Sequence, residues 1–215
     1  MLVNSPFLPA IKSAGGLTFS KWKGLNTARA RVFKNGSKTP KQIFQRDKFA
    51  YLMSIRKLLL KVVLEGWWKP YENNTTYINE WLKANLPEQP VYVNDSTPFA
   101  GDLSKIIMSL GDLAECRLAG DQTYDTATGA LSLNWSTTLS GNAEDTDLIN
   151  IQVINLEEKY QENDDYGERQ DGSGSDTLPT GMTATDIHLY CTPYRILIDG
   201  SVLFGNSFHK VCVAA

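Results

Sequence analysis

The residues that could carry out catalysis are few and lie far apart in the sequence. His188 and His209 are the only histidines, and each lies in a β-like segment with hydrophobic neighbours. A hydrolytic nucleophile is often held at a sharp strand-to-helix turn within a G-x-S-x-G motif, which this sequence lacks. We therefore interpret both histidines as structural or surface residues and predict that the protein is not an enzyme.

Two further patterns bear on metal binding. The segment Asp171–Asp176 resembles the start of a calcium loop, but such a loop needs glycine at its sixth position and an acid at its twelfth, where this chain has aspartate and Met182. The three cysteines, Cys116, Cys191 and Cys212, are too widely spaced for a zinc pattern or a disulfide framework. We expect reduced, buried thiols and predict no metal and no cofactor.

The charge of the chain is divided between its two parts. Residues 1–69 carry fourteen Lys and Arg against only Asp47 and Glu65, whereas residues 70–215 carry seven basic and twenty-two acidic residues. The two parts are therefore at +12 and −15, within a net charge of −3. Like charge gathered on this scale repels itself unless opposite charge lies nearby. Either the two parts neutralise each other, within or between subunits, or one part faces an external polyanion.

The basic part begins with an arm at residues 1–16, which we expect to dock on a neighbour, followed by a predicted β-hairpin at residues 17–33. With residues 24–26 as the turn, Lys21 would lie opposite Arg29. Alternation along both strands then gathers four cations on one face: Lys21, Lys23, Arg29 and Arg31. A two-stranded ribbon is marginally stable alone in water, so its other, apolar face must pack on something.

A long helix is predicted over residues 40–65. Thr39 is a suitable N-cap, the proline that follows suits the first helical position, and Gln42 completes a capping box. Cations that include Arg46 and Lys48 would be presented on a side away from the core. The apolar stripe of the helix predicts packing on that core: Phe44, Tyr51, Ile55, Leu58 and Val62.

The remainder of the chain predicts a second helix at residues 74–85. From about residue 113 the sequence pattern changes from helical to β-rich. Short β-rich segments with alternating apolar residues follow, separated by Gly, Asn, Asp or Pro, and this pattern is typical of an antiparallel β-sandwich. The fold class is therefore α+β, with an immunoglobulin-like or fibronectin-III-like sandwich. Three regions result: the arm at 1–16, a hairpin and helical region at 17–112 and the sandwich at 113–215. The expected sandwich core contains Leu131, Leu133, Trp135, Ile151, Val153, Ile187, Leu189 and Val211.

Residues 157–179 are too polar for a core and predict a long acidic loop. Its carboxylates would meet the basic hairpin and helix of a neighbouring subunit. The candidates for that contact are Asp164, Asp165, Glu168 and Asp171.

Several of these motifs resemble an uncharacterised family of proteins of about 200 residues from Bacteroidetes and their phages. The N-terminal part of the resemblance rests on these residues: Gly15-Gly16, Lys21-Trp22-Lys23-Gly24, Arg29-Ala30-Arg31, and Thr39-Pro40-Lys41-Gln42 with Arg46 and Phe49. The C-terminal part rests on these: Leu131 to Trp135, Arg169, Leu178-Pro179, His188, Tyr190 and residues 207–213. The chain departs from the family in its longer acidic loop. The resemblance implies a virion structural protein, with crAss-like phages as the natural setting.

We therefore expect a non-enzymatic, ring-forming neck or tail protein of a phage virion, assembled in the host bacterial cytoplasm. Its partners would be copies of itself and portal or tail components, and contact with packaged DNA stays open. No run of eighteen apolar residues predicts a membrane span, and the N-terminus does not have the pattern of a secretory signal. The main alternative is a nucleic-acid-binding protein that uses the basic hairpin and helix. A third reading is a host-surface or carbohydrate-binding module built on the sandwich.

Overall fold

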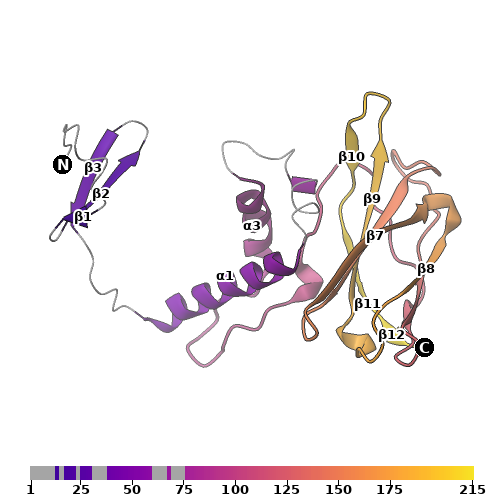
Figure 1. The fold of residues 1–215 in the computed structure, drawn as a ribbon, viewed down its shortest axis with the longest axis horizontal. Coiled ribbons are helices and arrows are strands. Elements are labelled where there is room, and N and C mark those ends of the chain that lie inside the picture. Colours follow the sequence, from indigo (N-terminus) through magenta and orange to yellow (C-terminus); the bar gives the residue numbers. More distant parts are fainter. Residues whose placement is uncertain (1–12, 15–16, 23–24, 31–37, 60–66, 69–75) are drawn as a thin grey trace. The chain divides into compact units, whose positions relative to one another are not determined.

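The computed structural model of the protein describes residues 13–14, 17–22, 25–30, 38–59, 67–68 and 76–215 (Figure 1). The chain divides into two compact units, residues 1–42 and residues 43–215. The predicted boundary between residues 112 and 113 falls inside the second unit. Apart from Ser13 and Ala14, the predicted docking arm lies outside the described residues.

The first unit contains one antiparallel sheet in the order β1-β2-β3, made of β1 (Ser13–Ala14), β2 (Leu17–Trp22) and β3 (Leu25–Ala30). The hairpin is present, but its predicted register is wrong. Thr18 pairs with Arg29, and Lys21 pairs with Asn26. The partner of Lys21 therefore differs from the predicted Arg29 by three residues, an odd shift in register. The predicted Lys21–Arg29 pair is not formed.

Helix α1 (Pro40–Leu58) and helix α3 (Tyr77–Glu88) precede the main sheets. Helix α1 begins at the predicted capping box, where the Gln42 N–H donates to Thr39 Oγ1 and the Thr39 N–H donates to Gln42 Oε1, both at 3.4 Å. It ends before the predicted residue 65, at a point that no glycine or proline marks, and residues 60–66 lie outside the described residues. Helix α3 starts after the N-cap Thr76, close to the predicted second helix.

The rest of the second unit is mostly β. One sheet has the order β10-β9-β6-β7, with β11 also paired to β9, and the other has the order β12-β4-β5-β8. All pairings are antiparallel except that of β12 with β4. The strands are β4 (Thr123–Tyr124), β5 (Ala130–Asn134), β6 (Leu148–Asn155), β7 (Tyr160–Glu168), β8 (Ser173–Thr177), β9 (His188–Ile196), β10 (Val202–Phe204), β11 (Phe208–Val211) and β12 (Val213–Ala214).

Residues of both sheets share one hydrophobic core. Alternation places Leu131 and Leu133 of β5 in that core, together with Ile151 and Val153 of β6. Of the predicted core residues, all are buried except Val211, which is half-buried. The burial of these apolar side chains is the main driving force for joining the two sheets, at about 1.5–3 kcal/mol for each large side chain.

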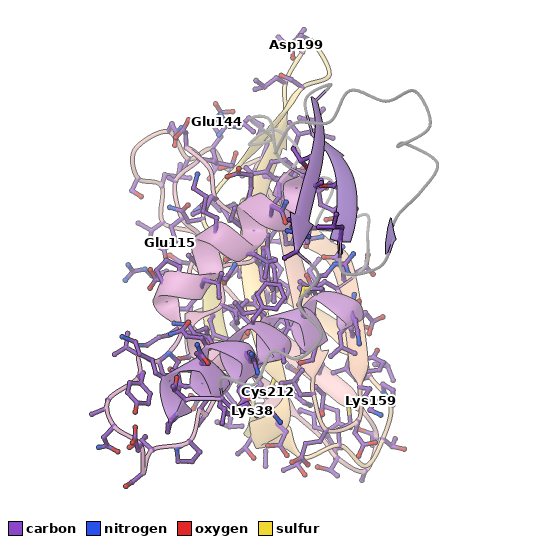
Figure 2. The ribbon with its side chains drawn as sticks, turned by 90° about the vertical axis from the view of Figure 1, so that its left-hand side faces the viewer. Lys38, Glu115, Glu144, Lys159, Asp199 and Cys212 are labelled. Atoms are coloured by element: carbon purple, nitrogen blue, oxygen red, sulfur yellow. The ribbon has the colours of Figure 1, made fainter. Side chains whose placement is uncertain are left out.

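A second core joins the helices to the outer face of the five-stranded sheet. The ribbons in Figures 1 and 2 show the helices beside that sheet. Odd-numbered residues of β6 face the first core, so Ile154 faces the helices, and it packs there with Tyr190 of β9. The Tyr190 hydroxyl donates to the Leu103 carbonyl at 2.8 Å, and Trp81 Nε1 donates to the Ile107 carbonyl at 3.0 Å. The helices and the sheets therefore belong to one unit.

The predicted acidic loop at residues 157–179 is wrong in its local structure. Most of it forms β7, a 3₁₀ turn at Arg169–Asp171 and β8. β7 and β8 are edge strands of their sheets. Charged side chains on an edge strand stay in contact with solvent and prevent pairing with the edge of another sheet. The polar composition of residues 157–179 therefore reflects their position at the sheet edges and not the absence of regular structure.

Candidate assembly interface

The predicted basic residues are distributed over two units. Arg29 is exposed on β3 and Arg46 is exposed on α1. Lys21 lies in β2, whereas Lys23 and Arg31 lie outside the described residues. Further cations are exposed on α1 and just before it: Lys38, Lys41 and Lys57. Of the predicted basic partner residues whose side chains the structure describes, Arg29 and Arg46 are the exposed ones.

Lys48 does not belong to this surface, and the prediction for it is wrong. Its side chain is buried, and its ammonium donates to the Gln89 carbonyl at 3.0 Å, at the C-terminal end of α3. A cation is favoured at that end of a helix by the helix dipole. Burial lowers the pKa of Lys48. The burial of Lys48 could have been predicted from the sequence, because Lys48 lies four residues from both Phe44 and Leu52 and so falls within the apolar stripe.

The predicted acidic residues are brought together along β7 and the turn that follows, but most are engaged within the chain. Asp165 accepts hydrogen bonds from Asn150 Nδ2 and from the Tyr194 hydroxyl, each at 2.9 Å. Asp171 accepts from the Glu168 N–H at 2.8 Å, and Glu168 accepts from Gln170 at 2.6 Å. Asp164 is exposed and accepts from the next backbone N–H at 2.8 Å.

Tyrosines tie the same carboxylates to the fold. The Tyr166 hydroxyl donates to Asp176 at 2.5 Å and so joins β7 to β8. Tyr160 donates to Glu162 on the same strand. Burial raises the pKa of Tyr166, and the adjacent Asp176 carboxylate adds to the effect. The acidic edge is therefore a hydrogen-bonded part of the fold whose outer oxygens remain available to a partner.

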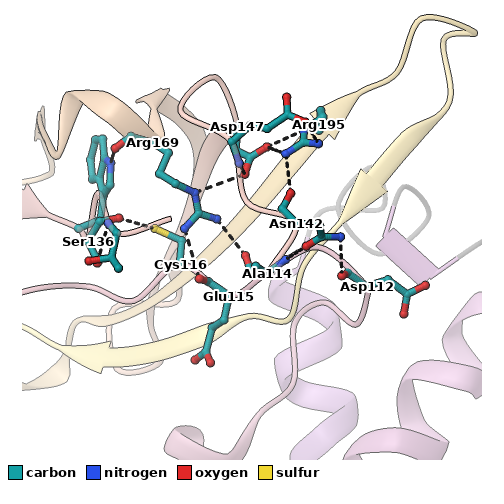
Figure 3. A network of polar contacts seen from close by, with 12 residues as sticks. Asp112, Ala114, Glu115, Cys116, Ser136, Asn142, Asp147, Arg169 and Arg195 are labelled. Carbon is teal, nitrogen blue, oxygen red and sulfur yellow. Dashed lines mark hydrogen bonds and ion pairs between the residues drawn. The ribbon is translucent and has the colours of Figure 1, made fainter. Parts of the chain in front are cut away.

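Sequence reasoning missed a buried ion cluster, shown in Figure 3, that holds this edge in place. Arg169 and Asp147 are both fully buried, with Arg169 Nε 3.3 Å from Asp147 Oδ2. The N–H of Nε does not point at this oxygen, so the contact is an ion pair without a hydrogen bond along that direction. Arg195 Nε donates to Asp147 Oδ1 at 2.7 Å, and its Nη1 donates to Glu144 at 2.6 Å.

The Arg169 guanidinium also fixes the irregular segment that leads toward β4. It donates to the carbonyl oxygens of Ala114 at 2.9 Å and Glu115 at 3.3 Å (Figure 3). The Arg169 carbonyl in turn accepts from Trp135 Nε1 at 3.2 Å. A single buried arginine thus connects the end of β7, the 114–116 segment and the core tryptophan. No sequence pattern pairs Arg169 with Asp147, because they lie 22 positions apart on different elements.

The outer face of the five-stranded sheet contains an unusual group of polar side chains. The register aligns Asn163, Gln152, Tyr190 and His209 across β7, β6, β9 and β11. Gln152 is fully buried, and neither of its amide atoms has a hydrogen-bond partner among the described residues. The side chains of Asn150, Asn163, Gln161 and Thr192 each have one such buried atom, again within the part of the chain that the structure describes.

The two histidines meet on this face. His188 Nδ1 lies 2.9 Å from His209 Nε2, and the two rings are stacked with centroids 5.2 Å apart. Burial, together with the neighbouring His188, lowers the pKa of His209 to about 4, while Asp102 opposes the shift. Burial also lowers the pKa of His188. Among the described residues, no group of three or more His, Cys, Asp and Glu side chains could hold a metal ion.

An apolar hairpin forms the last surface of interest. The turn between β9 and β10 extends beyond the neighbouring strands in Figure 1. Ile196 and Ile198 are 59% and 109% exposed, and Leu197 and Val202 are also exposed. Isolated exposed apolar residues are ordinary, but a group of four at one hairpin tip is typical of a contact surface.

Comparisons of the chain with family models, with curated proteins and with solved structures find no match. Within the described residues, no helix is both long and apolar enough to span a bilayer.

Proposed function

We propose that the protein is a non-enzymatic structural component of a phage virion, a ring-forming neck or tail protein that assembles in the host cytoplasm. Its partners would be further copies of itself and portal or tail proteins. The two sheets of the second unit would then act as an immunoglobulin-like or fibronectin-III-like sandwich that carries the contact surfaces. The core shared by residues of both sheets supports the sandwich interpretation.

The observation that carries this proposal is the N-terminal sheet. Its strands have two, six and six residues and form a compact unit separate from residues 43–215. A sheet with so few described residues gains stability from packing on another surface. A second copy of the chain is the partner surface that a ring provides.

The exposed charges are compatible with contact between unlike surfaces of neighbouring copies. Arg29 is exposed in the first unit, Arg46 is exposed in the second unit, and Asp164 is exposed on the acidic edge. Complementary potentials of this kind fix register and speed association. Contacts between unlike patches close into a ring when the rotation between subunits permits it. The apolar tip at Ile198 would add a non-polar contact.

The test is the mass of the full-length protein in solution, measured by sedimentation velocity at high protein concentration in low and high salt. We expect oligomers at low salt that dissociate as salt screens the charges. The double variant Arg29→Glu, Arg46→Glu should weaken association, whereas the matched reversal Lys105→Glu, at an exposed cation outside the proposed surface, should not. A monodisperse monomer at low salt, with absence of the protein from purified virions, would overturn the proposal.

Alanine variants at the basic residues distinguish the nucleic-acid alternative. A protein that neutralises phosphates binds DNA or RNA with an affinity that falls steeply with salt. Tight, salt-dependent binding that Lys21→Ala and Arg29→Ala weaken, without self-association, would favour that alternative. A weak binding with a flat salt dependence would count against it.

A further inference from the structure

The β9–β10 hairpin ends in an apolar surface that the second core leaves uncovered. Tyr194 of β9 pairs with Phe204 of β10, their rings lie 6.2 Å apart, and the Phe204 ring also packs on Trp67. Two residues further along the same face of the strands, Ile196 pairs with Val202, and both of these side chains are exposed. The apolar face of the hairpin therefore continues past the core into solvent.

Hydrogen bonds hold the turn at the end of this hairpin. The Leu197 N–H donates to the Ser201 carbonyl at 2.8 Å, and the Gly200 N–H donates to the Leu197 carbonyl at 2.9 Å. Asp199 accepts from the Ser201 N–H at 2.9 Å and from the Ser201 hydroxyl at 2.6 Å, and Figure 2 shows it at the end of the hairpin. Ile198 is thus presented to solvent on a hydrogen-bonded turn, so little conformational entropy would be lost when a partner covers it.

Helix α1 carries a matching surface away from its buried stripe. Ile43, Arg46 and Phe49 are spaced three residues apart and therefore form one row on the helix. All three side chains are exposed, the two apolar ones at 44% and 46%. This row, called here the α1 row, places a cation between two apolar side chains.

Charge gives the reason for pairing these two surfaces. Asp199 follows Ile198 in the turn, and neither Asp199 nor Arg46 has an ion-pair partner within the part of the chain that the structure describes. Contact between the surfaces would bury apolar area and pair the two charges, which fixes the register of the contact. A lipid bilayer suits the turn less well, because the Asp199 carboxylate would have to enter it together with Ile198.

We propose that the β9–β10 turn of one copy docks on the α1 row of a second copy, with Ile198 lying between Ile43 and Phe49 and Asp199 paired with Arg46. The inference rests on the proposed function, because it names a contact through which copies of the chain associate. The turn and the row are each exposed within one chain, so the contact joins unlike surfaces of two copies. Such a head-to-tail contact closes into a ring when the rotation between copies permits it.

Sedimentation velocity of the full-length protein at low salt tests the role of the turn. Ile198→Ser should raise the dissociation constant of self-association by about tenfold, as expected when one large apolar side chain is no longer buried on binding. The matched control is Leu139→Ser, which changes an exposed apolar residue outside both surfaces and should leave the dissociation constant unchanged.

Cross-linking tests the role of the α1 row. The three native cysteines are buried and free, so a cysteine introduced at an exposed position is the reactive one. A mixture of the Ile198→Cys and Phe49→Cys proteins should form covalent dimers on oxidation with copper phenanthroline. Peptide mass spectrometry should find position 198 linked to position 49. A mixture of the Leu139→Cys and Phe49→Cys proteins should not give a corresponding link.

The outcomes separate this inference from the proposed function. Association that persists unchanged in Ile198→Ser, or dimers in which position 198 is linked only to other parts of the partner, would overturn the inference and leave the proposed function standing. Binding of the parent protein, but not of Ile198→Ser, to phosphatidylcholine vesicles would assign the turn to a membrane and also overturn the inference. A parent protein that stays monomeric would overturn it as well, and absence from purified virions in addition would overturn the proposed function.

Discussion

Arg169 and Asp147 form an ion pair in which neither side chain has contact with solvent, and their charged atoms lie 3.3 Å apart. Removal of two charges from water is costly, and the cost is offset here by many hydrogen bonds to the same two groups. Asp147 accepts from the Glu144 N–H at 2.9 Å and from Arg195, and Arg169 donates to two backbone carbonyls. The pair therefore fixes several irregular segments at once.

The first prediction concerns this pair. Arg169→Met should lower the free energy of unfolding by about 3–5 kcal/mol, because it removes one of the two arginines that pair with the buried Asp147 carboxylate and the donor to the Ala114 and Glu115 carbonyls. Urea unfolding followed by tryptophan fluorescence measures the change.

The matched control is Arg117→Met. Arg117 pairs with Glu115 at 3.3 Å, but its side chain is 70% exposed. A surface pair of this kind contributes about 0–1 kcal/mol, so its loss should be small. Equal effects of the two substitutions would contradict a structural role for the buried pair.

The second prediction concerns the unpaired amide on β6. Gln152→Met keeps the side-chain volume and removes a fully buried amide that has no partner among the described residues. An unsatisfied buried polar group costs about 1–3 kcal/mol, so the substitution should raise the free energy of unfolding by up to that amount.

Asn85→Leu is the opposite case. The Asn85 amide is also fully buried but donates to the Trp81 and Ile107 carbonyls at 3.0 Å and accepts from the Ile107 N–H at 2.7 Å. Its replacement should destabilise the protein in the same urea experiment. If Gln152→Met also proved destabilising, a bound water or another partner would have to satisfy the glutamine.

The third prediction is a pH dependence from the histidine pair. The folded-state pKa of His209 is about 4, below the unfolded value of 6.5. Between these values the unfolded chain binds a proton that the folded chain does not, so stability falls as pH drops from 6.5 toward 4. Above pH 6.5 both states are neutral at this residue and its contribution is constant.

His209→Gln removes this titration. Urea unfolding at several pH values should show a shallower loss of stability between pH 6.5 and 4 in the variant than in the parent protein, with little difference in slope above pH 7. The same slope in both proteins would show that His209 is not held neutral by the fold.

The fourth prediction concerns the turn that precedes β5. Gly129 has a φ of +77°, and an added Cβ would lie 2.1 Å from the Leu178 carbonyl oxygen. Gly129→Ala should therefore destabilise through both backbone strain, about 1–2 kcal/mol, and a clash with backbone atoms, about 1–3 kcal/mol more.

Gly181→Ala separates the two contributions. Gly181 has a φ of +88°, but a Cβ there would meet no atom within 4 Å. Thermal unfolding should show the smaller loss for Gly181→Ala, and a loss as large as that of Gly129→Ala would indicate that strain alone is responsible.

Local chemistry made part of the fold predictable. The capping box at Thr39 and Gln42 marked the start of α1, and alternation at Leu131, Leu133 and Trp135 identified a buried strand face. Both patterns involve residues that are close in the sequence, so the geometry of one helix turn or one strand determines which side chains are neighbours.

What could not be predicted depends on contacts between distant segments. The burial of Lys48 is decided by Gln89, and that of Arg169 by Asp147. The strand at β7 could not be distinguished from a loop because its acids and amides are compatible with a sheet only beside β6. The hairpin register was also predicted wrongly, because Lys21 pairs with Asn26 and not with Arg29.

The order of strands in the four-stranded sheet has a consequence for how fast the chain folds. Thr123 of β4 pairs with Val213 of β12, and Ala130 of β5 pairs with Thr177 of β8, so this sheet joins residues that are far apart in sequence. Each such pairing requires closure of a long loop, and the entropy of that closure is lost before the stabilising contacts form. All-β topologies of this kind fold in milliseconds to seconds. The capped helix α1 relies on local contacts and forms much earlier, about microseconds for an isolated helix. Newly made chains should therefore spend most of their folding time with helical structure present and the sheet unfinished.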